Sequence, residues 1–272
     1  MISLLNITEE DVRNKLRYYL IDAKEGSDKW RILKSALKLS DYFSFTENRT
    51  YPRPDHPDER KRKPIIYMLV AILISLRTTL ENEQKAVLNL ISKFPNSEEL
   101  FKANTSEIEE CIKPAGMASR KALIIRRALD YVLDKFDGNL EQLAKLETEV
   151  ARDMILAIPG VGPKSADCLL SIGLGKASIA VDVNVFRVTS WIFSLPWAES
   201  PDYNDETQIK TVKDLIDSSI PKDAFLTQII HTYFLLYGKH VGSKHPSNGK
   251  CLINEFCLCC KKHIREQQLD LF

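Results

Sequence analysis

Two short segments of the sequence hold side chains that can do chemistry together. Residues 158–164 read Ile-Pro-Gly-Val-Gly-Pro-Lys, so that a glycine-rich turn is followed by the amine of Lys164. Eighteen residues later, Asp182 lies in the run Ala-Val-Asp-Val-Asn-Val-Phe-Arg and supplies a carboxylate. A turn of this form can grip a DNA backbone, and an amine combined with a carboxylate indicates a reaction at a sugar.

The turn itself is the Gly-Val-Gly of residues 160–162. Glycine reaches positive φ without steric cost and allows a sharp reversal between two apolar helices. The backbone N–H groups of the turn, and of a helix that begins at Pro163, then point outward and form a site for a nucleic-acid phosphate. The same three residues also fit an ordinary tight connection between helices. Only the flanking sequence can distinguish this interpretation from a phosphate-binding turn.

The elements that position these groups are predicted to be helices. Apolar residues recur every three or four positions, glycines are few, and strand signals are nearly absent, which is typical of an all-α protein. The predicted helices are 9–22, 28–42, 65–77, 82–94, 106–113, 118–135, 147–157, 163–174, 183–195, 206–218 and 222–238. Residues 51–63 contain three prolines and eight charged residues, and they predict a linker.

Charge and hydropathy limit the partners and the cellular locations that the protein can have. The 272 residues carry a formal net charge of +1, so any binding to nucleic acid must depend on local basic clusters. The longest apolar run, 65–76, is too short to cross a bilayer and predicts a buried helix. Residues 1–10 lack the basic start of a secretion signal. We therefore expect an intracellular protein without a membrane partner, in the cytoplasm or nucleoid of a prokaryote or the nucleus of a eukaryote.

Five blocks in order along the chain carry a resemblance that extends from residue 64 to residue 238. They are Ile-Ser-Leu-Arg-Thr-Thr at 74–79, Gly-Met-Ala-Ser-Arg-Lys-Ala at 116–122, the turn at 158–164, Val-Asp-Val-Asn-Val-Phe-Arg-Val at 181–188, and His231 seven residues before Gly238-Lys239. In these blocks the chain resembles the endonuclease III branch of the helix-hairpin-helix (HhH-GPD) DNA glycosylases.

The resemblance implies an all-α fold of two helical lobes with a DNA-binding cleft between them. A six-helix lobe would cover 64–176 and contain the helix-hairpin-helix motif at about 147–174. The second lobe would join 1–63 to 177–272 and end in a cysteine-rich loop.

The resemblance also implies roles for the two reactive groups. Asp182 matches the carboxylate that stabilises positive charge at C1′ of the sugar as the bond to the base breaks. Lys164 matches the lysine whose amine attacks the same carbon, forms a Schiff base and permits β-elimination of the 3′ phosphate. Two simpler interpretations stay open: Asp182 as the N-cap of a helix that begins at Val183, and Lys164 as a surface contact to a phosphate.

An enzyme that extrudes a base from a duplex must fill the gap that the base leaves. Met117 matches the wedge of the family, and Arg77 stands where relatives often carry glutamine and can stack or donate into the gap. The predicted DNA-binding residues are Arg77, Met117, Lys121, Gly160, Val161 and Gly162. The alternative interpretation is core packing for Met117 and a solvent-facing helix end for Arg77.

The cysteines are the chief departure from the family pattern. Many relatives hold a four-iron, four-sulfur cluster through C-x6-C-x2-C-x5-C, whose first position corresponds here to Gly242. Cys251 and Cys257 keep the five-residue gap of the last two ligands, but Asn248 falls on the second ligand position. Cys259 and Cys260 follow as additional thiols.

Three outcomes are open for this segment. The thiols of Cys251, Cys257, Cys259 and Cys260 can hold a [4Fe-4S] cluster with altered spacing, or the loop can have lost its metal altogether. A third possibility is zinc, bound by Cys251, Cys257 and Cys260 with either His263 or His245. The remaining cysteines, Cys111 and Cys168, lie in apolar helical patterns and are expected to be buried thiols.

The predicted function is that of a base-excision repair enzyme. We expect a monomer that binds double-stranded DNA containing a lesion or abasic site, removes an oxidised pyrimidine and cleaves the abasic site as a lyase. Two alternatives are a monofunctional glycosylase for a mismatched or modified base and a non-catalytic DNA-binding module. Arg77 and Leu80 differ from the residues of typical relatives, which leaves the excised base open.

Overall fold

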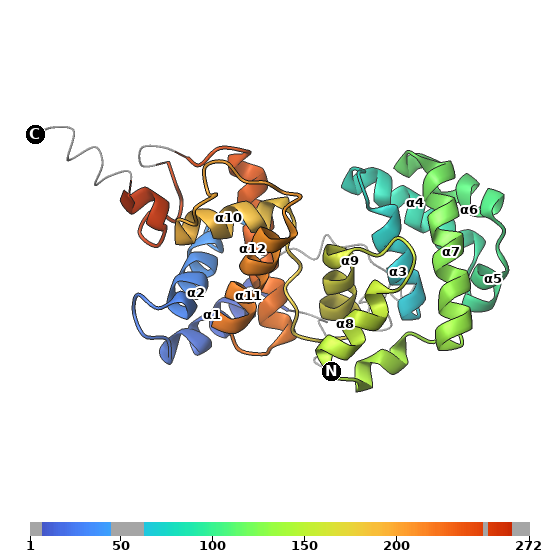
Figure 1. The fold of residues 1–272 in the computed structure, drawn as a ribbon, viewed down its shortest axis with the longest axis horizontal. Coiled ribbons are helices and arrows are strands. Elements are labelled where there is room, and N and C mark those ends of the chain that lie inside the picture. The colour runs from blue at the N-terminus through green and yellow to red at the C-terminus, as the bar shows by residue number, and fades with distance from the viewer. Residues whose placement is uncertain (1–6, 45–62, 247–249, 263–272) are drawn as a thin grey trace, which may run out of the picture. The chain divides into compact units, whose positions relative to one another are not determined.

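The computed structural model describes residues 7–44, 63–246 and 250–262 of the chain. Across these residues every regular element is a helix and no β-strand is present, which confirms the all-α prediction (Figure 1). The described residues divide into a first unit, residues 63–176, and a second unit, residues 7–44, 177–246 and 250–262. None of the described helices is long and apolar enough to span a membrane.

The first unit is organised around one helix that is buried along its whole length. Its elements are α3 (Ile65–Ile74), α4 (Leu80–Lys93), α5 (Ser97–Lys102), α6 (Thr105–Ile112), the 3-10 turn η2 (Lys113–Ala115), α7 (Ala118–Phe136), the 3-10 turn η3 (Glu141–Lys145), α8 (Thr148–Leu156), α9 (Pro163–Cys168) and the π-helical turn η4 (Leu169–Gly173). All ten residues of α3 are buried, and α3 packs against α4, α7, α9 and η4. The apolar run that begins at residue 65 is therefore the core of this unit.

The second unit joins residues from both ends of the chain in one hydrophobic core. Its helices are α1 (Glu9–Ile21), α2 (Asp28–Leu39), α10 (Val183–Phe193), α11 (Glu206–Ser219) and α12 (Ala224–Val241), and residues 258–262 are also helical. α10 packs along α12, and α2 packs against both α11 and α12. Leu16, Ile32, Trp191 and Tyr233 are all buried in this shared core. The N-terminal helices are thus part of the same unit as the last third of the chain.

Asp223 fastens α1 to the beginning of α12. Its carboxylate caps α12 by accepting from the N–H of Leu226 at 2.7 Å, and it also accepts from the Lys15 ammonium at 2.5 Å and the Tyr19 hydroxyl at 3.0 Å. Burial alone would raise the pKa of Asp223, but these hydrogen bonds outweigh burial and hold the pKa below its ordinary value. The link therefore depends on an ionised aspartate.

The predicted helices each overlap an observed helix, with differences that have local causes. The helix predicted at 163–174 is α-helical only to Cys168 and continues as the π-helical turn η4. α5 was not predicted, because its six residues show less than two turns of apolar spacing, although Asn96 caps this helix. The linker predicted at 51–63 lies outside the described residues except for Lys63, whose ammonium donates to the carbonyl of Pro95 at 2.5 Å.

Candidate active site and cysteine cluster

The turn between α8 and α9 requires a glycine at its first position. Gly160 has a φ of +83°, and a Cβ atom there would lie 2.2 Å from Cγ2 of Ile124. Gly162 has a φ of −98°, and a Cβ atom there would meet nothing within 4 Å. The expectation of a positive φ is thus confirmed for Gly160 and wrong for Gly162. Val161 is buried between them and anchors the turn to the first unit.

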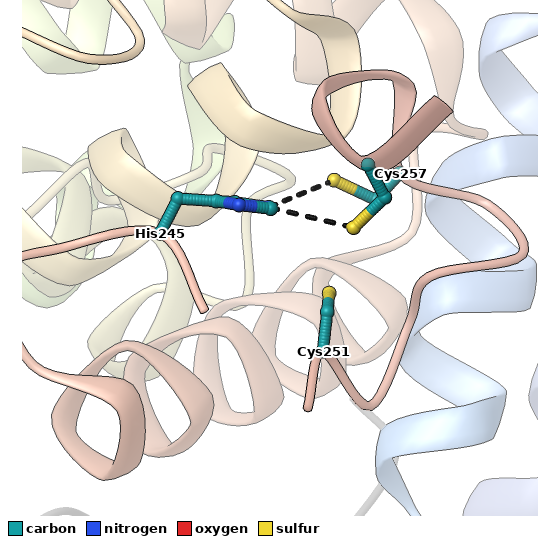
Figure 2. A group of neighbouring side chains, drawn as sticks. His245, Cys251 and Cys257 are labelled. Carbon is teal, nitrogen blue, oxygen red and sulfur yellow. Dashed lines mark hydrogen bonds between the residues drawn. The ribbon is translucent and has the colours of Figure 1, made fainter. Parts of the chain in front are cut away.

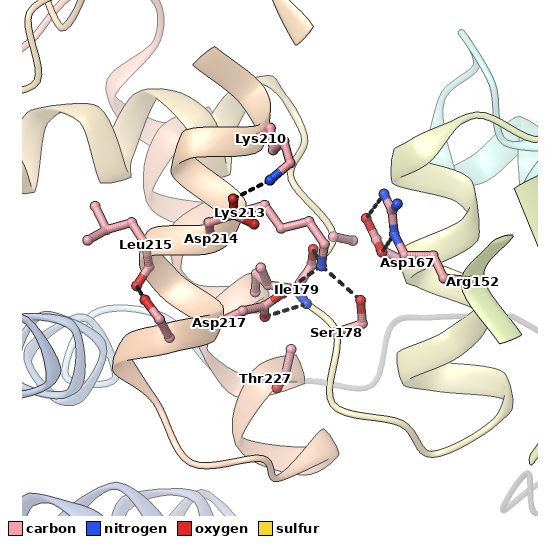
Figure 3. A network of polar contacts seen from close by, with 12 residues as sticks. Arg152, Asp167, Ser178, Ile179, Lys210, Lys213, Asp214, Leu215, Asp217 and Thr227 are labelled. Atoms are coloured by element: carbon pink, nitrogen blue, oxygen red, sulfur yellow. Dashed lines mark hydrogen bonds and ion pairs between the residues drawn. The ribbon is translucent and has the colours of Figure 1, made fainter. Parts of the chain in front are cut away.

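An ion pair between α8 and α9 holds the hairpin in shape (Figure 3). The guanidinium of Arg152 donates from Nε to Oδ1 of Asp167 at 2.8 Å and from Nη2 to Oδ2 at 3.4 Å. The Asp167 side chain is only 3% exposed, and that of Arg152 is 18% exposed. A bidentate ion pair of this kind fixes the relative orientation of the two side chains as well as their distance. The two helices of the motif are therefore joined by more than the turn.

Lys164 is the second residue of α9 and is partly exposed. The four residues that follow it, 165–168, are all buried in the first unit. The backbone of Lys164 is thus held by the hairpin on one side and by packed side chains on the other. A nucleophile benefits from a rigid support of this kind, because its amine then starts from a defined position.

Asp182 is the N-cap of α10, as one of the two simpler interpretations expected. Its Oδ1 accepts from the N–H groups of Asn184 at 2.9 Å and Val185 at 2.8 Å, and its Oδ2 accepts from the Asn184 side-chain amide at 3.2 Å. The residue is partly exposed. Each carboxylate oxygen has two lone pairs, so these contacts orient the group without exhausting its capacity as an acceptor. Capping and a role in catalysis are therefore compatible.

His231 anchors the segment that leads to Asp182. Its Nδ1 lies 2.7 Å from the carbonyl oxygen of Ala180, and because a carbonyl only accepts, Nδ1 carries the hydrogen. The ring is buried in the second unit. The sequence blocks included His231 but indicated no role for it, since a contact across 51 positions leaves no local pattern.

Lys213 and Asp217 hold the same segment from α11 (Figure 3). Asp217 accepts from the N–H of Ile179 at 3.1 Å, and Lys213 donates to Oγ of Ser178 at 2.9 Å and to Asp217 at 2.6 Å. In the sequence, these two charges look like an ordinary pair four positions apart on a helix. The structure shows that they also satisfy the backbone of an extended segment.

Gly238 allows α12 to approach α10 closely. A Cβ atom at Gly238 would lie 2.6 Å from the Cβ of Asn184, the residue whose side chain donates to Asp182. Arg187, which is buried, donates to the carbonyls of Gly238 and Gly242. The conformation around Asp182 therefore depends on a residue without a side chain on the neighbouring helix.

Met117 and Arg77 share an uncommon backbone conformation. Their φ angles are +50° and +53°, in the left-handed region that non-glycine residues rarely adopt. Met117 is 47% exposed and directly precedes α7, which rules out core packing for this residue. Arg77 is exposed between α3 and α4. Both residues are thus presented at the surface of the first unit by strained turns.

Lys121, which was predicted to bind DNA, does not lie at the surface. It is 5% exposed, and its ammonium donates to the carbonyl oxygens of Ile74 at 2.8 Å and Ala115 at 2.9 Å. Burial lowers the pKa of this lysine. The ammonium ties the end of α3 to the turn before Met117, so Lys121 supports the two exposed turns.

A family model described as HhH-GPD superfamily base excision DNA repair protein matches residues 70–213, more than half of the chain. The match includes the hairpin, Lys164 and Asp182. The chain belongs to the HhH-GPD superfamily. At the level of the family it is therefore a base-excision DNA glycosylase, and the resemblance drawn from the sequence is confirmed.

Two curated relatives and one solved structure illustrate the range of the superfamily. Endonuclease III of Thermotoga maritima is 28% identical over 204 residues, covering 74% of this chain and 86% of the relative. The thymine/uracil-DNA glycosylase of Pyrobaculum aerophilum is 24% identical over 200 residues, covering 73% and 82%. A trapped covalent intermediate of endonuclease III with DNA has a TM-score of 0.62 at 21% identity, covers 93% of this chain and 99% of that one, and shows the shared fold.

The C-terminal segment of this HhH-GPD protein gathers one histidine and three cysteines, of which Figure 2 labels His245, Cys251 and Cys257. The ligand atoms of His245, Cys251, Cys257 and Cys260 all lie within 4.8 Å of one another. Nε2 of His245 is 3.3 Å from Sγ of Cys257 and 3.6 Å from Sγ of Cys260. The three cysteines are buried, and His245 is partly exposed. The other histidine considered from the sequence, His263, lies outside the described residues.

Hydrogen bonds between the sulfur atoms of this cluster shift the pKa values of its thiols in opposite directions. Hydrogen bonds from Cys257 and Cys260 lower the pKa of Cys251, whereas the Cys251 sulfur raises the pKa of Cys257. Such mutual contact requires sulfur atoms that converge on a small common space.

The donor set does not fit the four-iron cluster of many HhH-GPD relatives. That cluster takes four cysteine thiolates, which four irons and their bridging sulfides hold apart. Here one of the four donors is an imidazole, and the donor atoms converge to within 4.8 Å. Cys259, which was also predicted as a ligand, is buried but is not part of the converging group within the described residues. Cys111 and Cys168 are buried free thiols, as expected.

Proposed function

We propose that the protein is a bifunctional DNA glycosylase, which removes a damaged base and then cleaves the abasic site as a lyase. Its substrate is double-stranded DNA that carries an oxidised pyrimidine or an abasic site, and the protein acts as a monomer. The observation on which the proposal depends is Lys164, an amine on the rigid helix that follows the hairpin. A glycosylase that uses only water does not need an amine at this position.

In the proposed reaction, Lys164 attacks C1′ of the sugar as the bond between C1′ and the base breaks. The base leaves with a proton, and opening of the sugar ring gives a Schiff base between Nζ and C1′. Loss of a proton from C2′ then breaks the bond between C3′ and its oxygen, which releases the 3′ phosphate. The step requires some of the amine to be neutral, since a protonated amine has no lone pair.

Asp182 is proposed to stabilise the positive charge that develops at the sugar during base release. Its contacts with Asn184 and Val185 hold the carboxylate in one orientation, so that little reorganisation is needed as the charge develops. A carboxylate fixed by backbone N–H groups is also prevented from rotating away when DNA binds.

DNA binding is proposed to use the hairpin and the two strained turns of the first unit. The open space beside Gly162 gives a phosphate room to approach the backbone N–H groups of the turn. Met117 is the proposed wedge that enters the base step, and Arg77 donates to or stacks in the gap left by the extruded base. All three residues are exposed.

Covalent trapping tests the proposed lysine chemistry. Borohydride added to the protein with a duplex containing an abasic site reduces the Schiff base to a stable crosslink. We expect a crosslink with the wild type and with Lys145→Ala, which removes an exposed lysine from the same unit, and none with Lys164→Ala. Absence of a crosslink in the wild type, or its persistence in Lys164→Ala, would refute the mechanism.

Asp182→Asn separates the capping role of this residue from its role in catalysis. Asparagine is as good an N-cap as aspartate, so the fold should keep its stability. The negative charge is lost, and we expect base release to fall by at least about a hundredfold, in the range found for removing one electrostatic contact to a transition state. Base release at the wild-type rate with an intact fold would leave Asp182 as a cap only.

A monofunctional glycosylase is the second candidate function. It is favoured by the similarity to a thymine/uracil-DNA glycosylase, which is nearly as close as the similarity to endonuclease III. In that case Lys164→Ala would still release the base, and only Asp182→Asn would abolish release. A panel of duplexes, each with one lesion or mismatch, tests the substrate: preferred release of an oxidised pyrimidine supports the proposal, and preferred release of mismatched thymine or uracil supports the second candidate.

A further inference from the structure

We propose that His245, Cys251, Cys257 and Cys260 bind one zinc ion, which fastens the C-terminal segment to the second unit. Four ligands at ~2.3 Å from a tetrahedral zinc ion lie roughly 3.8 Å from one another. The separations of His245 Nε2 from the sulfurs of Cys257 and Cys260, 3.3 Å and 3.6 Å, are close to that value. The whole set lies within 4.8 Å, which leaves space for a single ion between the four atoms.

The chemistry of the donors also favours zinc. Three thiolates and one imidazole are a common ligand set for structural zinc, and soft sulfur ligands select against magnesium and calcium. Four protein ligands close the coordination sphere, so that no position is left for water or substrate. The site is therefore structural, and zinc takes no part in the reaction proposed above.

The order of the ligands along the chain differs from the cluster motif of the family. Here the ligands follow the spacing His-x5-Cys-x5-Cys-x2-Cys, and the position of the first family cysteine is occupied by Gly242. Gly242 directly follows α12 and has a φ of +76°, a conformation that favours glycine. The chain turns there and brings His245 to the cluster three residues later. His245 thus supplies the donor for which the first thiol of the family pattern is missing.

The surroundings of the four residues are those of a protected metal site. The hydroxyl of Tyr237, which is buried on α12, lies 3.2 Å from Sγ of Cys251 and supplies a hydrogen bond to that sulfur. The ring of Trp191 packs edge-on against the His245 ring, with 5.2 Å between the ring centres. These two aromatic side chains orient ligands and exclude water from two sides.

The ligand positions explain what the metal would hold together. His245 follows α12, Cys251 lies in the loop after it, and Cys257 and Cys260 lie at the start of the last helical segment. The loop between them is anchored on α2, where Arg31 donates to the carbonyl of Phe256 at 3.1 Å. A zinc ion would join these three stretches, and its binding energy would stabilise this part of the fold.

The inference is tested by metal analysis of the full-length protein purified from cells grown with both iron and zinc. We expect one zinc per chain, no iron, and no visible absorbance from an iron–sulfur cluster. Replacement of zinc by cobalt should give the intense visible bands of a tetrahedral ion with sulfur ligands. Iron and sulfide in equal amounts with visible absorbance, or no metal even after anaerobic incubation of the reduced protein with zinc, would overturn the proposal.

Single substitutions test which side chains bind the zinc ion. His245→Ala is the mildest change, because His245 is partly exposed on a loop, and it should weaken zinc binding at least tenfold in competition with a chelator. Cys257→Ser should do the same, and Cys259→Ser is the matched control, since Cys259 is a buried thiol of the same segment outside the ligand group. Unchanged affinity in His245→Ala, or loss of zinc in Cys259→Ser, would contradict the assigned ligands. If Cys257→Ser does not fold, the comparison of His245→Ala with Cys259→Ser remains decisive.

Discussion

Lys121 and Ile74 are 47 positions apart in the sequence, and Nζ of Lys121 lies 2.8 Å from the carbonyl oxygen of Ile74. The same ammonium lies 2.9 Å from the carbonyl oxygen of Ala115. One buried charge therefore satisfies the end of α3 and the turn before α7 at the same time. The two turns that present Arg77 and Met117 are held at a fixed separation by this side chain.

Lys121→Met should destabilise the first unit without removing any surface charge. Two buried carbonyl oxygens would lose their donor, which costs about 2 kcal/mol of unfolding free energy. Circular dichroism during urea unfolding measures the loss. Arg120→Met, at the exposed neighbouring position, is the control and should stay within about 0.5 kcal/mol of the wild type. Equal effects of the two variants would show that the ammonium of Lys121 has no structural role.

Met117→Gly should make the protein more stable and a poorer DNA binder. Glycine adopts positive φ without strain, so relief of the left-handed conformation gains about 1 kcal/mol. Loss of the proposed wedge should weaken binding to abasic-site DNA about tenfold, equivalent to ~1.4 kcal/mol. Met154→Gly is the matched control, since it makes the same change within α8 and should destabilise by about 1 kcal/mol. A stabilised Met117→Gly protein with full DNA affinity would remove Met117 from the proposed interface.

The two glycines of the hairpin should respond differently to alanine. Gly160→Ala places a Cβ atom 2.2 Å from Ile124 at positive φ, and we expect a loss of about 2 kcal/mol or more in stability. Gly162→Ala meets open space at an ordinary φ, so its stability should change by less than about 0.5 kcal/mol. Its added methyl group would instead stand where a phosphate is proposed to approach, and DNA affinity measured by fluorescence anisotropy should fall. Unchanged affinity in Gly162→Ala would argue against a phosphate at the turn.

Asp223→Asn should weaken the second unit in a way that depends on pH. Asparagine keeps the cap of α12 but loses the ion pair with Lys15, which we expect to cost about 2 kcal/mol at neutral pH, between the values for exposed and buried pairs. Because the pKa of Asp223 is lowered in the folded state, its contribution is complete above the unfolded value of about 3.9 and is lost as the pH falls below it. The difference between wild type and variant should therefore shrink toward about pH 3.

Tryptophan fluorescence measures this effect directly, because all three tryptophans of the chain, Trp30, Trp191 and Trp197, belong to the second unit. Urea unfolding followed by this signal at several pH values gives the two stability curves. A difference that stays constant from neutral to acidic pH would mean that the charge of Asp223 does not stabilise the fold.

The helices could be predicted from the sequence because each one carries its own local signals. Apolar residues spaced three or four positions apart mark the buried face of α7, and the observed N-caps Thr79 and Asp205 are of residue types that favour this position. The π-helical turn after Cys168 has no such signal, since its apolar residues fit an α-helix equally well. Local patterns therefore predicted which elements exist better than their detailed geometry.

Contacts between residues that are far apart in the sequence could not be predicted from the sequence. A lysine after Arg120 in a basic stretch suggested a DNA contact, and only the fold shows that Lys121 points into the core. The choice of His245 over Cys259 as the fourth member of the cluster depends in the same way on how the loop after Gly242 turns. In both cases the residue type predicted which interactions the side chain can make, but not which atoms it contacts in the fold.

The division of the chain has a consequence for the order of folding during synthesis. The described residues of the first unit form one continuous stretch, 63–176, so their contacts can form once residue 176 has left the ribosome. α1 and α2 pack against each other and are synthesised before this stretch, but α11 and α12, against which α2 also packs, are synthesised after it. The two N-terminal helices can therefore pair with each other but cannot complete their core while the first unit folds.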